Sequence, residues 1–341
     1  MREIAWKSST LFPRYGRKGW SILKNEKMVD NLSEIEVKQR VESWLPTNPL
    51  LVGAPSADTY VPPSAVASLQ DGVIAISRKN SLNYTIAFSA CSVFLLIFGV
   101  LNNADTIFAY SVACFLLATG FLVNFIYSNR PGVLTEKAQF FYWLKTSMKA
   151  KYSALSWTVF ISLVGAFQLI LMYYYGSVHN IIKDFGVYYP AVRSGQSWRL
   201  LIGPFFHYSL LLFMINALLL IFAGWVCSIF NTAFVISLFL LGNVIGAYAQ
   251  MSFGGQLFNN YAGISPGIFC LLTVFVSYGF FKRGVLPKGM GIYFAFIFSS
   301  ALVSTAYLQH TATVSHIAGS LLGLLGAAVY SILQRVRRLT E

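Results

Sequence analysis

Acidic residues are scarce in this chain. It has 12 Asp and Glu in 341 residues, against 25 Lys and Arg, and only 11% of its residues are charged. Soluble globular domains have about 25% charged residues. Because 56% of the residues are also apolar and 16% aromatic, the composition excludes an ordinary soluble protein and indicates a polytopic membrane protein.

Cysteine motifs and an early apolar run are missing as well. The four cysteines, Cys91, Cys114, Cys227 and Cys270, have neither CxxC spacing nor a nearby histidine. We therefore expect buried thiols rather than a metal or redox site. No apolar run begins before about Tyr84, which predicts that no cleavable signal peptide is present and that the first transmembrane helix starts insertion.

Eight apolar stretches are long enough to cross a bilayer, for which about 20 residues are needed. They cover residues 84–101, 107–127, 157–175, 208–230, 233–253, 265–281, 290–308 and 314–333. The first two predict a transmembrane hairpin. The last six predict a separate six-helix block that begins near Trp157.

Basic residues are concentrated on one side of these predicted spans. With the N-terminus in the cytoplasm, 22 of the 25 Lys and Arg lie in cytoplasmic segments, and only Lys183, Arg193 and Arg199 lie outside. This asymmetry follows the positive-inside rule and predicts cytoplasmic N- and C-termini. The asymmetry accounts for the net charge of +13, because the partner of these basic residues is the lipid bilayer. A nucleic-acid partner is not expected. The signal-less N-terminus and compact loops fit a bacterial cytoplasmic (inner) membrane.

The predicted organisation has four parts and an all-α fold. They are a cytosolic N-terminal region (1–80), a transmembrane hairpin (81–128), a basic and aromatic cytosolic linker (129–156) and a six-helix core (157–341). Ser33 and Glu36 have the spacing of a capping box and predict a short helix within residues 31–44. In the linker, the aromatic run 140–144 precedes three lysines, which predicts an interfacial helix on an anionic leaflet.

A serine bracketed by glycines lies at the start of the sixth apolar stretch. Ser265 follows Gly263 and precedes Pro266 and Gly267, so we expect a sharp turn that leads directly into a helix. Proline suits a first helical turn, because its missing N–H would have no intrahelical partner there. A hydroxyl at such a helix start lies near free amides and the positive end of the helix dipole, which suits acyl chemistry.

His316 is the predicted partner of this serine. It lies about one turn inside the last span, on the same outer side of the membrane as Ser265, so the two side chains have similar depth. If the helices touch, the imidazole can act as a base toward the hydroxyl. No acidic residue occurs in the six core spans, which favours a dyad. The alternative is that His316 only forms a hydrogen bond within the bundle. The chain has three other histidines: His207 precedes the fourth span, and His179 and His310 lie in the predicted outer loops.

Small and polar residues in two other spans complete the candidate site. Gly319 and Gly323 form a GxxxG pattern one turn after His316, which predicts close helix packing. Asn216 is an isolated amide in the aliphatic fourth span. It could stabilise an oxyanion together with the backbone N–H of Ser265, or it could form an interhelical hydrogen bond with no part in chemistry.

Taken in this order, these residues resemble the rhomboid family of intramembrane serine proteases over roughly residues 157–339. The resemblance rests on the following positions: Gly195-Gln-Ser-Trp-Arg-Leu200, His207, Asn216, Gly263-Ile-Ser265 and His316-x-x-Gly319-x-x-x-Gly323. It implies a Ser265 nucleophile, a His316 base, Asn216 in the oxyanion hole, and Trp198 and Arg199 as a structural loop signature. It also implies cleavage of membrane-protein substrates in or near a transmembrane helix, without metal or cofactor.

Two positions depart from the pattern of the family. Rhomboids usually have a second histidine, which contributes to the oxyanion hole, where this chain has Leu212. Loss of one such donor costs about 100- to 1000-fold in rate elsewhere. The residue after the nucleophile is usually glycine and is Pro266 here.

The sequence is also compatible with two other functions. The family includes inactive members that bind transmembrane helices and control their trafficking or degradation, although these typically lack the serine or the histidine. A transporter or channel is the third possibility. It is disfavoured because the core spans lack charged residues and show no inverted repeat of broken helices.

Overall fold

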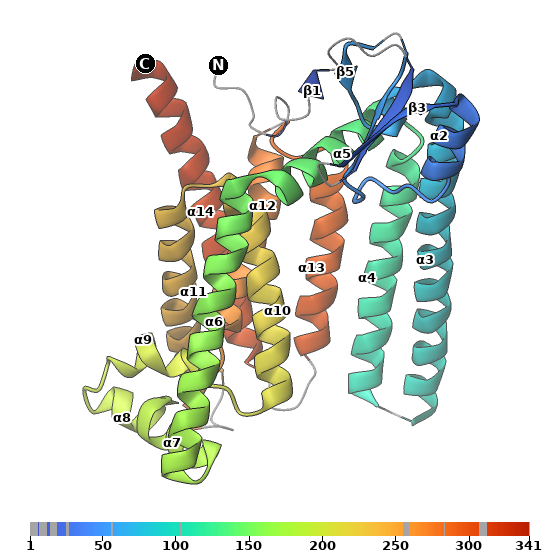
Figure 1. Ribbon diagram of the computed structural model, residues 1–341. Coiled ribbons are helices and arrows are strands. Elements are labelled where there is room, and N and C mark those ends of the chain that lie inside the picture. The colour runs from blue at the N-terminus through green and yellow to red at the C-terminus, as the bar shows by residue number, and fades with distance from the viewer. Residues whose placement is uncertain are drawn as a thin grey trace. The chain divides into compact units, whose positions relative to one another are not determined.

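The computed structural model describes residues 6, 12–13, 19–24, 27–55, 57–102, 104–254, 259–282, 284–306 and 312–340. It is mostly helical and divides into two compact units (Figure 1). One unit comprises Met1–Ser147 with Arg283–Ser300, and the other comprises Met148–Lys282 with Ala301–Glu341. Helix α13 (Met290–Ala306) therefore contributes its first part to one unit and its last turns to the other.

The first unit begins with a small α+β region, so the all-α prediction is wrong there. Three antiparallel strands pair in the order β3 (Lys27–Leu32), β2 (Trp20–Lys24), β4 (Leu50–Gly53), and β1 (Phe12–Pro13) pairs with β5 (Thr59–Tyr60). Helix α2 (Glu34–Val41) starts with the predicted capping box of Ser33 and Glu36. The sheet and helix enclose Ile22, Val37, Trp44 and Val52. Strands of two to six residues, one of them polar at the sheet edge, leave little periodic signal in a sequence.

The rest of the first unit is helical. It contains η1 (Pro63–Ala65), α3 (Ala67–Asn102), α4 (Asp105–Tyr127), α5 (Pro131–Thr146) and the first part of α13. Helices α3 and α4 pack along each other, as the predicted hairpin requires (Figure 1). Helix α3 begins 14 residues before the predicted hairpin. Ser92 and Ser111 join the two helices through reciprocal hydrogen bonds to each other's backbone.

The aromatic run of the linker is buried in protein rather than spread on a leaflet. Phe140 is completely buried and packs edge-on against Trp6. Tyr142 clusters with Leu51 and Tyr60 of the N-terminal region. A helix does form in this segment as α5, but its aromatic side chains hold the first unit together.

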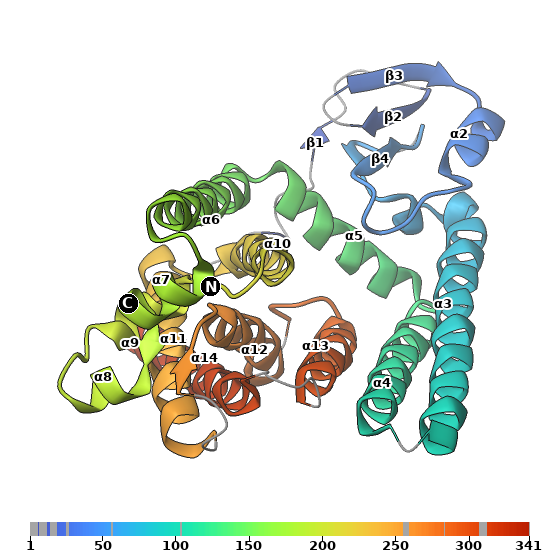
Figure 2. The same cartoon turned by 90° about the horizontal axis from the view of Figure 1, so that it is seen from below.

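The second unit is an antiparallel helical bundle with a structured loop. Its elements are α6 (Met148–Tyr175), α7 (Val178–Phe185), β6 (Val187–Tyr188), α8 (Tyr189–Arg193), α9 (Arg199–Ile202), η2 (Gly203–Phe205), α10 (Leu210–Val226), η3 (Cys227–Ile229), α11 (Thr232–Phe253), β7 (Asn260–Tyr261), α12 (Ser265–Phe281) and α14 (Thr313–Thr340). Helix α12 lies among α10, α11 and α14 (Figure 2). Twelve of its 17 residues are buried, which is typical of a helix that is apolar on all sides.

Six described helices are long and apolar enough to cross a membrane: α3, α4, α6, α10 with η3, α11 and α14. The chain is thus a multi-pass membrane protein. The remaining two predicted spans fall on shorter apolar helices, α12 and α13. Their passage across the whole bilayer stays a prediction.

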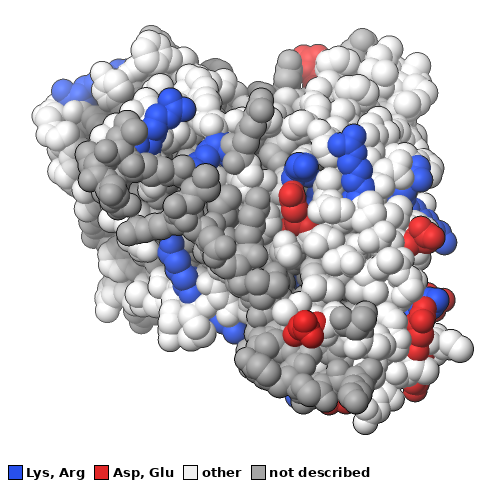
Figure 3. All heavy atoms as spheres, turned by 90° about the horizontal axis from the view of Figure 1, so that it is seen from above, with Lys and Arg blue, Asp and Glu red and all other residues white. Residues whose placement is uncertain are grey.

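Basic residues divide between the two ends of the second unit. Lys149, Lys151, Lys282 and Arg335 lie where α6 begins and where α12 and α14 end. Lys183, Arg193 and Arg199 lie in the loop region at the opposite end. Figure 3 looks on the first of these ends and shows Lys and Arg side chains spread over it.

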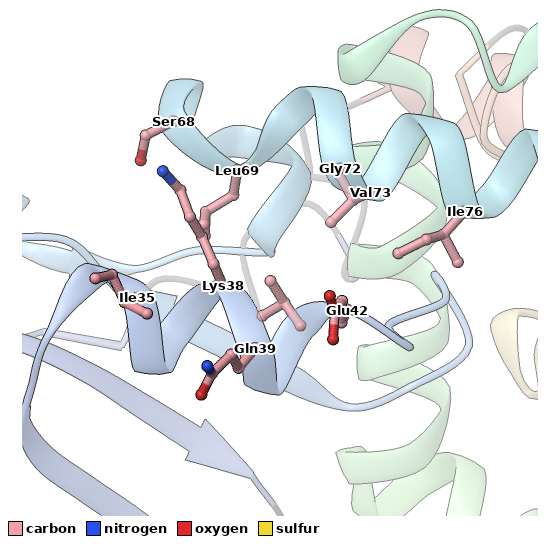
Figure 4. Close-up of a pocket in the computed structure, with 10 residues that line it drawn as sticks. Ile35, Lys38, Gln39, Glu42, Ser68, Leu69, Gly72, Val73 and Ile76 are labelled. Carbon is pink, nitrogen blue, oxygen red and sulfur yellow. The ribbon is translucent and has the colours of Figure 1, made fainter.

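A groove of about 310 Å³ lies in the first unit between α2 and the first turns of α3 (Figure 4). Its walls are mainly aliphatic, with Ile35, Val41, Leu69, Val73 and Ile76 among them. Lys38 at its edge forms an i,i+4 ion pair with Glu34 at 2.8 Å. The groove thus presents apolar surface rather than a group for catalysis.

Candidate active site

Ser265 is the first residue of α12, as the proline and glycines around it predict. The turn before it depends on Gly263, whose φ of +128° lies in the region that side-chain-bearing residues rarely adopt. Pro266 occupies the first helical turn. As the first helical N–H, that of Ser265 has no partner one turn back within the helix. The serine therefore combines a hydroxyl and a backbone donor at one point.

The loop before Ser265 is bonded to the long loop between α6 and α10. Strand β6 pairs antiparallel with β7, and the Gly263 N–H donates to the Pro204 carbonyl at 3.0 Å. The Tyr261 hydroxyl donates to the Gly263 carbonyl at 2.6 Å. Burial raises the pKa of Tyr261, so the phenol remains a donor at neutral pH. These bonds fix the turn that presents the serine.

The predicted loop signature has a structural basis. The Arg199 guanidinium is buried and donates to the carbonyls of Lys183 and Gly186 at 3.1 and 3.0 Å, and to the Gln196 side chain at 2.7 Å. It also lies 4.9 Å from the ring centre of Trp198, in cation–π geometry. One planar cation thus ties together segments of the loop that holds the serine turn.

His316 meets the serine directly. Its Nε2 lies 2.7 Å from the Ser265 Oγ, which is hydrogen-bond distance. The imidazole is 5% exposed and its ring stacks obliquely on Phe269, with the centroids 4.7 Å apart. Phe269 comes one turn after Ser265 on α12. The same helix therefore supplies the hydroxyl and the surface against which the imidazole rests.

A third group, Thr305, completes the arrangement and is not among the residues that the sequence patterns indicate. Its Oγ1 lies 3.0 Å from Nδ1 of His316 and 2.8 Å from the Leu302 carbonyl. A threonine hydroxyl has a single proton, and the carbonyl can only accept it. Thr305 Oγ1 then accepts from Nδ1–H, which leaves Nε2 free to accept from Ser265. A polar residue in an apolar span was the available signal.

Asn216 lies beside the serine turn. It is 3% exposed, and its Nδ2 has no hydrogen-bond partner among the described residues. Both this atom and Ser265 Oγ lie 3.9 Å from the point that a Cβ on Gly263 would occupy. A buried amide donor without a partner is costly. Beside a hydroxyl that can attack a carbonyl, it is suited to receive the negative charge that develops on the carbonyl oxygen.

Leu212 lies one helical turn before Asn216 on α10. Residues four apart share a helix face, so an aliphatic side chain occupies the position next to the amide. The Leu212 backbone N–H is used in the helix cap, where it donates to the Ser209 hydroxyl at 3.2 Å. The site has one side-chain donor on this helix where the resemblance implies two.

Glycines allow the helices that carry Ser265 and His316 to approach. A Cβ on Gly319 would collide with the Pro266 carbonyl, and one on Gly323 with the Cys270 carbonyl. Both obstacles are backbone atoms of α12, which cannot rotate away. The GxxxG pattern of α14 thus contacts the serine helix itself, as close packing of small residues in membranes requires.

Helix α11 fixes the starts of both other helices. The Asn243 side-chain oxygen accepts from the Gly267 N–H at 3.0 Å, which satisfies one of the unpaired donors of the first turn of α12. The Gln250 side-chain oxygen accepts from the Ser315 N–H at 3.2 Å. Two buried amides on one helix therefore hold the serine turn and the histidine turn in register.

His207 and His179 do not join this cluster. His207 is buried, its backbone exchanges two hydrogen bonds with Gln168, and its ring packs edge-on against Phe213. Burial lowers the pKa of His207 to about 4, so the ring is neutral at physiological pH. His179 is exposed on α7, and His310 lies outside the described residues.

In chemical terms, the site joins a hydroxyl, a base oriented by a second hydroxyl, and two donors beside the nucleophile. These are the components of acyl transfer by a serine. The arrangement lies wholly within the second unit, on α10, α12, α14 and the last turns of α13.

Comparison with known families agrees with the resemblance seen in the sequence. The family model of the Rhomboid domain matches residues 194–332, a segment that contains Asn216, Ser265 and His316. The predicted family is confirmed over that segment, which begins after α6 and is shorter than the predicted range 157–339. No curated protein matches the chain.

Proposed function

The chain carries a Rhomboid domain over residues 194–332, and on that premise we propose that it is an intramembrane serine endopeptidase. It would cleave a peptide bond in or near a transmembrane helix of a membrane-protein client. The observation that carries this proposal is the 2.7 Å separation between Ser265 Oγ and His316 Nε2. Ser265 is the proposed nucleophile, His316 the base, and Asn216 the oxyanion donor.

Acylation would begin with proton transfer from Ser265 Oγ to His316 Nε2 as the oxygen attacks the scissile carbonyl carbon. The C–O bond forms and the carbonyl electron pair moves onto its oxygen. The imidazole becomes an imidazolium, whose Nδ1–H remains bonded to Thr305. The hydroxyl of Thr305 thereby orients the ring and stabilises its positive charge without taking a proton.

The tetrahedral oxyanion would be bound by Asn216 Nδ2 and the Ser265 backbone N–H. Both donors are in place before the reaction, so little reorganisation is needed when the charge develops. The intermediate then collapses as the C–N bond breaks. His316 Nε2–H protonates the leaving amine, and the N-terminal part of the client remains as an ester on Ser265.

Deacylation would repeat the sequence with water. His316 takes a proton from a water molecule as its oxygen attacks the ester carbon, and then returns that proton to Ser265 Oγ as the C–O bond breaks. A carboxylic acid and the free enzyme are the products. No group other than those of the chain and water is required by this sequence of steps.

We also propose the orientation and organisation predicted from the sequence. The basic ends of the helices, with the N- and C-termini, would face the cytoplasm of a bacterial inner membrane, and Ser265 would lie toward the outer face. Residues 1–80, 81–128 and 129–156 would form the cytosolic region, hairpin and linker that precede a protease core of residues 157–341.

A second candidate function is a rhomboid-like protein that binds transmembrane helices without cutting them. Leu212 is the observation that favours it, because this residue leaves Asn216 as the only side-chain donor on its helix face. A weak oxyanion hole slows acylation but leaves client binding intact.

Labelling with a mechanism-based serine probe separates the two functions. A protease predicts covalent labelling of the purified wild type, and loss of labelling in both Ser265→Ala and His316→Ala. Ser331→Ala is the matched control, because that hydroxyl only bonds the Ala327 carbonyl of its own helix. A folded wild type that takes no label under conditions that label a known serine protease would favour the binding function.

A further inference from the structure

A second cavity lies at the opposite end of the bundle from the serine. It has a volume of about 560 Å³ and is lined by the starts of α6 and α11 and by η3, all within the second unit. Phe230 in its wall packs on Tyr278 at a centroid distance of 5.1 Å. Tyr278 comes thirteen residues after Ser265 on α12, about 20 Å along the helix axis. The cavity is therefore separate from the candidate active site.

The two helices line it with matching faces. On α6 the lining residues are Lys149, Tyr152, Ser153, Ser156, Trp157 and Phe160, and on α11 they are Thr232, Val235, Ile236, Phe239 and Leu240. Both sets follow the i, i+3, i+4 spacing of one helix face. In both, polar groups lie in the first turns and aromatic or aliphatic groups lie deeper. The cavity thus changes from polar to apolar over about 16 Å.

The polar end contains groups suited to an anion. Lys149 Nζ donates to the Phe230 carbonyl at 2.8 Å, and its ammonium group has two further donors. The Ser228 side chain is 4% exposed, lines the cavity, and its Oγ has no partner among the described residues. A buried hydroxyl without a partner is unfavourable unless a ligand or water satisfies it.

The cavity is open to the outside of the bundle between α6 and α11. Tyr152 and Ile236 at its edges are 60% and 45% exposed, whereas Trp157 and Phe239 behind them are buried and pack edge to face. A volume of this size falls in the range of ligand-binding pockets. A single acyl chain entering between α6 and α11 would cover these aromatic surfaces.

We propose that this cavity binds an anionic glycerophospholipid. Its phosphate would accept hydrogen bonds from Lys149 and from the hydroxyls of Ser228 and Thr232, and one acyl chain would lie against Phe160 and Phe239. Basic pockets between helices at the cytoplasmic surface are suited to anionic headgroups, and the cavity lies at the end of the bundle that carries Lys149, Lys151, Lys282 and Arg335. The proposal does not depend on protease activity.

Native mass spectrometry of the full chain with defined lipids tests it. The Ser265→Ala protein is released from micelles that contain dioleoyl phosphatidylglycerol and dioleoyl phosphatidylcholine in equal amounts. It should retain more phosphatidylglycerol than phosphatidylcholine. Lys149→Gln should reduce that preference about fivefold, the effect of one basic residue near an anionic surface. Lys151→Gln is the control, because that residue lies two positions along α6 and does not line the cavity.

A second variant avoids the loss of the Lys149 hydrogen bond to Phe230. Ile236→Trp fills the apolar end from its lipid-exposed edge and should displace the lipid while leaving that bond in place. Equal retention of the two lipids by the starting protein would overturn the proposal. So would an equal effect of Lys149→Gln and Lys151→Gln, or competition by glycerol phosphate as effective as that by the intact lipid.

Discussion

Thr305 lies on the far side of the His316 ring from the serine, with its hydroxyl oxygen 3.0 Å from Nδ1. Because the same hydroxyl donates to the Leu302 carbonyl, it can only accept from the imidazole. A neutral residue thus does for this histidine what a carboxylate does in a soluble serine protease: it selects the tautomer. The core spans contain no acidic residue, and this geometry needs none.

Replacing Thr305 by valine should therefore slow catalysis without harming the fold. Valine keeps the branched shape but removes the acceptor, and the loss of one hydrogen bond of ordinary strength predicts about a tenfold fall in kcat. KM should be unchanged, because Thr305 does not contact the client. Steady-state cleavage of a single-span reporter measures both constants.

Thr305→Ser is the matched control for that experiment. It restores the hydroxyl and loses only a methyl group, so its kcat should return to within about threefold of wild type. If Thr305→Ser and Thr305→Val are equally slow, or if only KM changes, the threonine serves packing and the tautomer argument is wrong.

Asn216→Ala should reduce kcat by about 100- to 1000-fold if the amide binds the oxyanion. Leu212→His, one turn away on the same face of α10, should raise kcat by supplying the missing donor. The two changes act on the same charge in opposite directions. An unchanged or lower rate in Leu212→His would show that the lack of a second side-chain donor does not limit the rate.

Two glycines of α14 provide a test of the helix contact. Gly319→Ala places a Cβ against the Pro266 carbonyl, which cannot move aside, so α14 must shift away from the serine helix. Overpacking of this kind costs about 1–3 kcal/mol, and both the Tm and the cleavage rate should fall. Gly326→Ala meets only the side chain of Leu238 at 3.0 Å.

Gly326→Ala is thus the control, because both changes raise helix propensity equally. We expect it to keep wild-type cleavage within about twofold. Tm and reporter cleavage of the two variants in the same detergent measure the difference. Equal behaviour of the two variants would contradict the assignment of Gly319 to the helix contact.

The first unit should show a pH-dependent stability that depends on Lys137. This residue is buried on α5, and its ammonium group donates to the Asn124 side chain on α4 at 2.6 Å. Burial lowers its pKa to about 8, whereas a lysine in an unfolded chain has a pKa of about 10.4. Between these two pH values the unfolded state binds more protons than the folded state, so the free energy of unfolding increases with pH. This added stability is lost as the pH falls to the folded-state pKa of about 8.

Thermal unfolding at pH 7.0 and pH 9.5 tests this sign. The Tm of wild type should rise between these two pH values by more than that of Lys137→Met. Lys79→Met, an exposed lysine on α3, should keep the wild-type rise. A rise of the same size in Lys137→Met would mean that other groups cause it.

Much of the helical architecture follows from the sequence because apolar length and loop charge are local properties. The hairpin of α3 and α4 and the capping box at Ser33 could be predicted in this way. The small sheet could not, because its strands are short and depend on pairing between residues distant in the chain, such as Ser21 with Gly53. The burial of Phe140 likewise depends on a partner, Trp6, 134 residues away.

The candidate site divides in the same manner. Ser265 and His316 stand out because a glycine-bracketed serine and a histidine occur near the starts of apolar helices. Thr305 and Phe269 do not, because hydroxyl and aromatic residues are common in membrane helices and only the folded geometry brings these two to the imidazole. The supporting amides Asn243 and Gln250 become visible only when α11 packs beside α12 and α14.

The proposed function requires Ser265 and His316 to act together on a peptide bond. The purified, detergent-solubilised protein is assayed for cleavage of a generic single-span reporter, beside Ser265→Ala and His316→Ala. This assay is the most direct test of that requirement. We expect cleavage by wild type and a loss of about 10⁴-fold or more in each variant, with the two losses not additive in the double variant. A wild type that is folded but inert, or a Ser265→Ala protein that still cuts, would contradict it.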